Sequence, residues 1–208
     1  MRGLLICLEG GEGAGKSTAM TVIQQTLESA GRQSISTREP GGTPAAEQIR
    51  ELLLSPATGD LDPITELLLM FAARRENVQQ VIQPALEAGI DVICDRFTDA
   101  SHAYQGGGRQ LGAEPVDQLA SIVHPGLQPD LVVLLDVPVE VGLNRIRQRE
   151  DGPDRFESDR GAFLHRVREA YLQRAQAHPD SFVVIDATQS VEQVAACIRN
   201  ALHERLLT

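Results

Sequence analysis

The residues with the clearest chemical capacity stand near the start of the chain, at positions 10–17, and read GGEGAGKS. They match the pattern G-x-x-x-x-G-K-[ST], with an apolar run before them and a helical pattern after them. The glycines let backbone N–H groups turn toward a phosphate, and the positive end of the following helix adds to this attraction. The segment therefore predicts a nucleoside-triphosphate site. The residues predicted to bind the nucleotide are Gly10, Gly11, Glu12, Gly13, Ala14, Gly15, Lys16, Ser17 and Thr18.

Two side chains of this loop, and one outside it, could handle the charge of a triphosphate. Lys16 is the only lysine among 19 basic residues, and its compact ammonium can follow the β- and γ-phosphates where a guanidinium would crowd the loop. Ser17 offers a hydroxyl to Mg²⁺. Asp95 follows the apolar residues 92–94 and is predicted to end a strand beside the first one. We therefore expect Ser17 and Asp95 to hold the metal.

The hydrophobic pattern predicts the elements that position these residues. Short apolar runs alternate with longer segments of helical period, which indicates an α/β protein whose parallel strands are buried on both faces. Strands are predicted at residues 4–8, 34–37, 90–94, 131–135 and 182–185. Helices are predicted at residues 16–30, 44–54, 64–88, 115–123, 158–177 and 190–206.

Composition excludes several classes of protein. The 208 residues fit one domain, and the formal charge of -10 argues against binding nucleic acid or an anionic membrane by bulk charge. No apolar run approaches the roughly 18 residues of a membrane span, and the first apolar run is too short for a signal peptide. Three scattered cysteines favour a reducing, cytoplasmic setting.

The loop alone fits either a nucleotide-driven switch or motor, or a phosphoryl-transfer enzyme. The guanine-reading motif N-K-x-D is impossible because Lys16 is the only lysine, and no aspartate has a glycine three residues later. The chain is also short for a motor. Several arginines downstream fit an acceptor site and a lid, which favours a kinase of a small anionic substrate.

Several blocks, taken together and in order, make the chain resemble bacterial thymidylate kinases over essentially its whole length. These blocks are residues 10–17, 37–43 (TREPGGT), 67–75 (LLLMFAARR), 95–97 (DRF), 103–109 (AYQGGGR), 145–149, 154–157 and 186–188. The resemblance implies transfer of the γ-phosphoryl group of ATP to dTMP with Mg²⁺, by a cytoplasmic homodimer. We predict one kinase domain over residues 1–208, a three-layer P-loop NTPase fold with a five-stranded parallel sheet in the order 2-3-1-4-5.

The resemblance also implies how dTMP is held. Arg96 and Arg38 would bind its phosphate as guanidinium forks. Glu12 would lie near the nucleotide 3′-hydroxyl and the catalytic arginine. Tyr104 would lie under the sugar and exclude a 2′-hydroxyl, and Gln105 would line the site.

Recognition of thymine is assigned to a second group of residues by the same resemblance. Phe71 would stack on the base, Arg75 would bond its O4 atom and Ser101 would face N3. Arg74 and Arg75 are adjacent, and Arg75 is chosen because a four-residue step from Phe71 places both on one helix face.

A mobile lid is predicted at about residues 144–157. In this family the catalytic arginine lies either in the phosphate loop or in the lid, and Gly13 after Glu12 leaves none in the loop. We expect Arg149 to reach the transferring group, with Arg155 as the second candidate. The predicted catalytic residues are Lys16, Glu12, Arg96, Arg149 and Arg155.

Two finer expectations and two alternatives remain. The resemblance predicts a cis peptide bond between Glu39 and Pro40, and it places residues 186–188 beside the adenine. One alternative is a related kinase of another small acceptor, such as dUMP or dCMP. The other is a nucleotide-binding regulator without catalytic activity.

Overall fold

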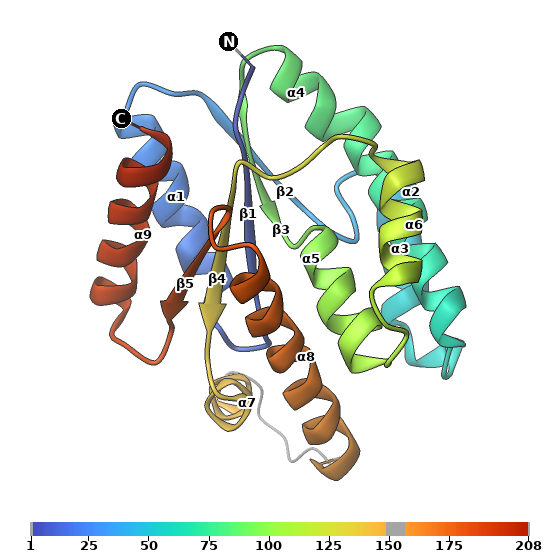
Figure 1. Cartoon of the computed structure of the whole chain (residues 1–208). Coiled ribbons are helices and arrows are strands. Elements are labelled where there is room, and N and C mark those ends of the chain that lie inside the picture. The colour runs from blue at the N-terminus through green and yellow to red at the C-terminus, as the bar shows by residue number, and fades with distance from the viewer. Residues whose placement is uncertain (1, 149–156, 208) are drawn as a thin grey trace.

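The fold is built on a five-stranded parallel sheet (Figure 1). The computed structural model describes residues 2–148 and 157–207. The strands are β1 (Leu5–Gly10), β2 (Ser34–Arg38), β3 (Asp91–Asp95), β4 (Leu131–Asp136) and β5 (Phe182–Asp186). Their order is β2-β3-β1-β4-β5, which confirms the predicted order. Each strand overlaps its predicted range, and all except the edge strand β2 follow a near-continuous apolar run, because the inner strands are covered on both faces.

Helices cover the two faces of this sheet (Figure 1). On one face α1 and α9 pack through residues such as Ile23, Leu27 and Ile198; on the other, α8 packs with the segment around α4 through Val167 and Leu86. The helices are α1 (Lys16–Ser29), α2 (Pro44–Leu54), α3 (Pro63–Asn77), α4 (Gln83–Glu87), α5 (Thr98–Ser101), α6 (Glu114–Val123), α7 (Val139–Arg147), α8 (Glu157–Ala177) and α9 (Val191–Leu206).

Three helical regions differ from the prediction. The helix predicted at 64–88 is interrupted by π-helical geometry at Val78–Ile82; Pro84 lacks the N–H that a regular helix would donate one turn back, and the interruption lies just before it. Residues 98–108 form α5 and a π-helical segment at His102–Gly108, and α7 was also not predicted. The glycines at 106–108 weaken the helical signal of residues 98–108.

The parallel register brings the candidate site residues to one edge of the sheet. Asp95 pairs with Leu8 of β1 and with Arg38 of β2, so the phosphate loop, Arg38 and Arg96 all follow strand ends at this edge. Ligands of open α/β sheets bind at this edge. Within residues 2–148 and 157–207, no helix combines the length and apolar character needed to cross a bilayer.

Candidate functional site

The phosphate loop connects β1 to α1 and packs tightly against α7. Gly13 has φ +69, and a Cβ atom there would lie 2.2 Å from the carbonyl oxygen of Gly142. A Cβ atom on Gly142 would in turn lie 2.3 Å from the carbonyl oxygen of Glu12. The loop therefore requires glycine at position 13 for its backbone conformation and for this contact.

Lys16 lies across the mouth of the loop. Its Nζ atom donates to the carbonyl oxygens of Gly10 at 3.2 Å and Gly11 at 3.1 Å. Burial lowers the pKa of Lys16 to about 8, and the charge of Arg96 acts in the same direction. A triphosphate bound in the loop would supply a negative counter-charge that stabilises the ammonium form of Lys16. Ser17 and Thr18, on the first turn of α1, are exposed to the solvent.

A cavity of about 410 Å³ extends from the loop toward α9. Its lining includes Gly13, Gly15, Thr18, Ala187 and Gln189. It also includes a residue that sequence reasoning assigned only to the lid, Arg145, which donates to the carbonyl oxygens of Gly13 at 3.4 Å and Ala187 at 2.9 Å. The predicted segment 186–188 thus reaches this cavity through Ala187. Asp186 instead accepts two bonds from Thr188.

A second cavity, of about 450 Å³, lies on the other side of the loop. Glu12 lines this second cavity, whereas the next residue, Gly13, lines the first. Of the residues predicted for the acceptor, Arg96, Tyr104 and Gln105 also line it. The cavities are therefore neighbours that share the loop as a wall.

Three arginines gather near the second cavity. Arg96 lines it and donates to the hydroxyl oxygens of Tyr171 at 3.1 Å and Tyr104 at 2.9 Å. Arg50, which sequence reasoning missed, also lines it and donates to the Pro40 carbonyl oxygen at 2.9 Å. Burial lowers the pKa of Arg50, and the charges of Arg38 and Arg96 lower it further. This concentration of positive charge suits an anion.

The third of these arginines is Arg38, at the end of β2. Arg38 is exposed, and its Nη2 atom pairs with Glu47 at 2.9 Å. The peptide bond between Glu39 and Pro40 is cis, which confirms that prediction. Arg50 carries a signal that could have been used, since it is the only basic residue of the sequence between the TREPGGT block and α3.

The structure corrects the two assignments on α3. Phe71 is 1% exposed and packs with Leu67 and Val116 in a small core cluster instead of facing the cavity. Arg75 is exposed and donates to the Val123 carbonyl oxygen at 2.7 Å. The helix face that lies along the cavity carries Glu66 and Met70. The prediction placed Phe71 at the cavity, whereas the preceding residue, Met70, lies there, because packing of α3 against α6 turns Phe71 inward.

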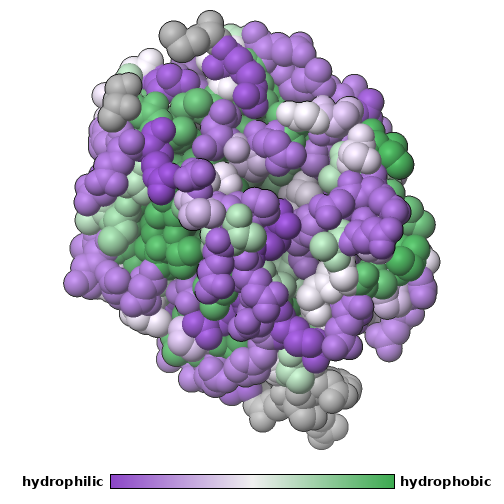
Figure 2. All heavy atoms as spheres, in the orientation of Figure 1, coloured by the Kyte–Doolittle hydropathy of each residue, from purple (hydrophilic) through white to green (hydrophobic). Residues whose placement is uncertain are grey.

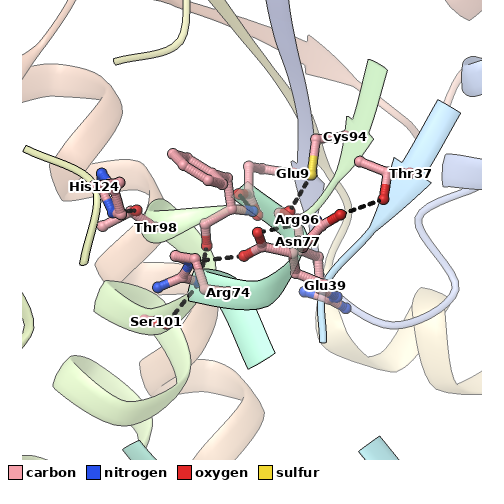
Figure 3. A network of polar contacts seen from close by, with 11 residues as sticks. Glu9, Thr37, Glu39, Arg74, Asn77, Cys94, Arg96, Thr98, Ser101 and His124 are labelled. Atoms are coloured by element: carbon pink, nitrogen blue, oxygen red, sulfur yellow. Dashed lines mark hydrogen bonds and ion pairs between the residues drawn. The ribbon is translucent and has the colours of Figure 1, made fainter. Parts of the chain in front are cut away.

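Arg74 lies four residues after Met70, on the same face of α3. It is fully buried and donates to Ser101 Oγ at 3.1 Å and to Glu39 Oε2 at 2.6 Å (Figure 3). The amide of Asn77 donates to the second oxygen of Glu39 at 3.2 Å and accepts from Thr37 at 2.8 Å. Burial raises the pKa of Glu39, whereas Arg74 opposes this shift. The network fixes the guanidinium between α3 and the cavity wall.

Several buried polar atoms near these cavities have no hydrogen-bond partner among the residues that the structure describes. They are Arg74 Nη1, Gln105 Oε1 and Asp95 Oδ1. Such atoms are costly unless a ligand, a metal or water completes their bonding. Gln105 does use its Nε2 atom, which donates to Glu66 at 2.8 Å. The predicted catalytic residues Arg149 and Arg155 lie outside the described residues.

The fold and the phosphate loop together define a P-loop phosphoryl-transfer enzyme, in which two neighbouring cavities adjoin the loop. The family model for thymidylate kinase matches residues 8–198. The chain is 54% identical to thymidylate kinase of Chromohalobacter salexigens over 98% of its length and 97% of that protein. It is 53% identical to the enzyme of Pseudomonas putida (93% and 92%) and 51% identical to that of Alkalilimnicola ehrlichii (97% and 93%). The chain belongs to the thymidylate kinase family.

Proposed function

We propose that the first cavity holds ATP and the second holds dTMP for the reaction of this family. The chain transfers the γ-phosphoryl group of ATP to the phosphate of dTMP, which gives ADP and dTDP. The observation that carries the assignment of the cavities is that Glu12 lines one and Gly13 the other. Two phosphates held on either side of one loop are close enough for direct transfer, which depends on positioning and charge neutralisation.

The donor side is proposed to work through the phosphate loop. Residues 10–18 bind the phosphates through backbone N–H groups and Lys16, and Arg145 borders the nucleoside. Ser17 and Asp95 would hold Mg²⁺, and the buried oxygen of Asp95 without a partner among the described residues supports this. When bound, the metal neutralises charge between the two nucleotides.

The acceptor side is proposed to bind dTMP from phosphate to base. Arg96 and Arg38, joined by Arg50, bind the phosphate, and Glu12 lies near the sugar and the transferring group. Tyr104 contacts the sugar. Met70 takes the stacking position expected of Phe71. The base edge is bonded by Gln105, which lines the cavity, and by Arg74 and Ser101, which are buried beside the lining residues Glu39 and Ala100.

The rest of the proposal concerns the lid and the setting of the enzyme. Arg149 and Arg155 remain the predicted catalytic arginines of a lid at about residues 144–157, within one kinase domain. Arg147, at the end of α7, belongs to this segment. The unpaired thiols of Cys7, Cys94 and Cys197 fit a cytoplasmic enzyme.

Coupled ADP-release assays with dTMP, dUMP, dCMP and dGMP test the reaction. We expect dTMP to be the best acceptor and dUMP to follow within about tenfold, because the missing methyl group is worth on the order of 1 kcal/mol. We expect dCMP to be weaker by a further factor of about ten, because its exocyclic amine faces the guanidinium of Arg74 with no acceptor for it. Release of ADP with none of the four would favour the regulator instead.

We further propose a homodimer through the outer face of α3 and α6. Ile64, Leu68 and Ile122 on these helices are 44%, 51% and 72% exposed, and Figure 2 shows hydrophobic surface on this side of the molecule. A second copy would cover these side chains.

Replacing Leu68 by glutamate should weaken the dimer by at least about 100-fold, because it would bury an unpaired charge. Val191, which is 61% exposed at the start of α9, provides the matched control, and Val191→Glu should leave the dimer intact. Sedimentation velocity over a concentration series measures both. A dimer that survives Leu68→Glu and dissociates with Val191→Glu would place the interface elsewhere.

A further inference from the structure

Arg96 is held between two tyrosine hydroxyl groups that differ in their access to the cavity. Tyr104 lines the acceptor cavity, and the Arg96 guanidinium lies 4.7 Å from the centre of its ring. Tyr171, on α8, is 1% exposed and accepts from Arg96 Nη1 at 3.1 Å. Because Tyr171 is enclosed by protein, any effect that it has on the acceptor must pass through its neighbours. These include Arg96, which it hydrogen-bonds, and Tyr104, whose ring centre lies 6.3 Å from its own.

Tyr171 is hydrogen-bonded in turn to a buried carboxylate, Glu9, which lies near the end of β1, just before the phosphate loop. The Tyr171 hydroxyl donates to Glu9 Oε2 at 2.7 Å. The hydrogen of the phenol is thus directed to the carboxylate, so that its oxygen lone pairs face the Arg96 guanidinium. Burial, followed by the charge of Asp99, raises the pKa of Glu9 to about 7, whereas the bond from Tyr171 lowers it.

Glu9 also fixes the backbone that carries Arg96. Its Oε1 atom accepts from the N–H of Phe97 at 2.7 Å, and the N–H of Arg96 itself donates to the carbonyl oxygen of Leu8 at 3.0 Å. Arg96 has φ +71, a left-handed conformation that is unfavourable for a residue with a side chain. Glu9 is therefore linked to Arg96 in two ways. It bonds the N–H of the next residue, Phe97, and it bonds the hydroxyl of Tyr171, which contacts the guanidinium.

We infer that Glu9 and Tyr171 are positioning residues, which hold the guanidinium of Arg96 in the orientation that binds the acceptor phosphate. This inference rests on the proposed role of Arg96. Neither side chain touches the acceptor in this arrangement. Both act by limiting the rotamers and backbone conformations of Arg96, so that less of its freedom is lost when dTMP binds.

Tyr171→Phe and Glu9→Gln test the inference, because each removes a hydrogen bond or a charge and keeps the shape of the side chain. Each should raise the KM for dTMP about tenfold, the usual value of a hydrogen bond to a charged group, and should leave the KM for ATP within about twofold. Arg166→Gln is the matched control. It removes a contact of the same helix, from Arg166 to the Gly108 carbonyl oxygen at 3.0 Å, without touching Arg96.

The variant Arg96→Ala separates the two levels of the argument. If it leaves the KM for dTMP unchanged, the proposed role of Arg96 is wrong, and the inference fails with it. If it raises this KM while Tyr171→Phe and Glu9→Gln behave like Arg166→Gln, only the positioning role is overturned. Support requires in addition that Tyr171→Phe has no further effect in the Arg96→Ala background. Thermal unfolding of each variant confirms that the comparison is made on folded protein.

Discussion

Replacing Arg74 by alanine is expected to lower kcat/KM for dTMP by about 10- to 100-fold, which is the range for bonds to a charged group. Arg74 is buried against Ser101 and Glu39, and its Nη1 atom has no partner in the described part of the chain. The variant should also lose roughly 3–5 kcal/mol of stability, because it leaves the buried carboxylate of Glu39 without its cation. Steady-state kinetics with varied dTMP, together with thermal unfolding, measure the two effects.

The neighbouring residue supplies the control for this prediction. Arg75 is exposed and donates to a carbonyl oxygen of α6, so Arg75→Ala should change kcat/KM by less than about twofold. Arg74→Lys keeps the positive charge beside Glu39 and covers the case in which Arg74→Ala does not fold; it should still lose affinity, because an ammonium lacks the planar fork. Larger losses at Arg75 than at Arg74 would contradict the phase of α3 described above.

Replacing Lys16 is expected to have the largest effect on turnover. Lys16→Ala should reduce kcat by about 10²–10³-fold, as removal of a group that stabilises developing charge does in other enzymes. Lys16→Arg should be almost as damaging, because the guanidinium would have to fit where Nζ now contacts the carbonyl oxygens of Gly10 and Gly11. Measurement of kcat at saturating ATP and dTMP decides between these outcomes.

Stability distinguishes this loss from misfolding. Lys16 makes no ion pair at salt-bridge distance among the described residues, so its removal should shift the melting temperature by only a few degrees. A Lys16→Arg enzyme that keeps more than about a tenth of the wild-type kcat would contradict the steric reason given for the single lysine.

Sequence reasoning predicted the sheet more fully than the helices. All the strands except β2 are near-continuous apolar runs whose signal is local, and the order of the strands follows from the family resemblance. The helices at α5 and α7 were missed. In the π-helical segment that follows α5, Gly106, Gly107 and Gly108 are poor helix formers. Two of them are required because a Cβ atom at Gly107 or Gly108 would lie 2.5 Å from side chains of α8, which is a tertiary constraint that a single sequence does not express.

The site divides in the same way. The phosphate loop is contiguous, so its residues could be identified from their spacing alone. The residues of α3 that face the cavity could not be identified in this way. Residues 67–71 read LLLMF, and an unbroken apolar run does not show which side of a helix faces the core. Contact with α6 decides that Phe71 faces inward and Met70 faces the cavity. Glu9 escaped notice because a carboxylate at the end of an apolar strand has the same sequence signature as an exposed one.

The paired glycines at 13 and 142 restrict how this enzyme could be redesigned. With backbone against backbone, this seam leaves no room for even one methyl group on either side. Attempts to change the preferred phosphoryl donor by mutagenesis should therefore leave the seam untouched. They have more freedom at the rim of the same cavity, where Gln148 and Gln189 contribute side chains that can be exchanged without moving the main chain.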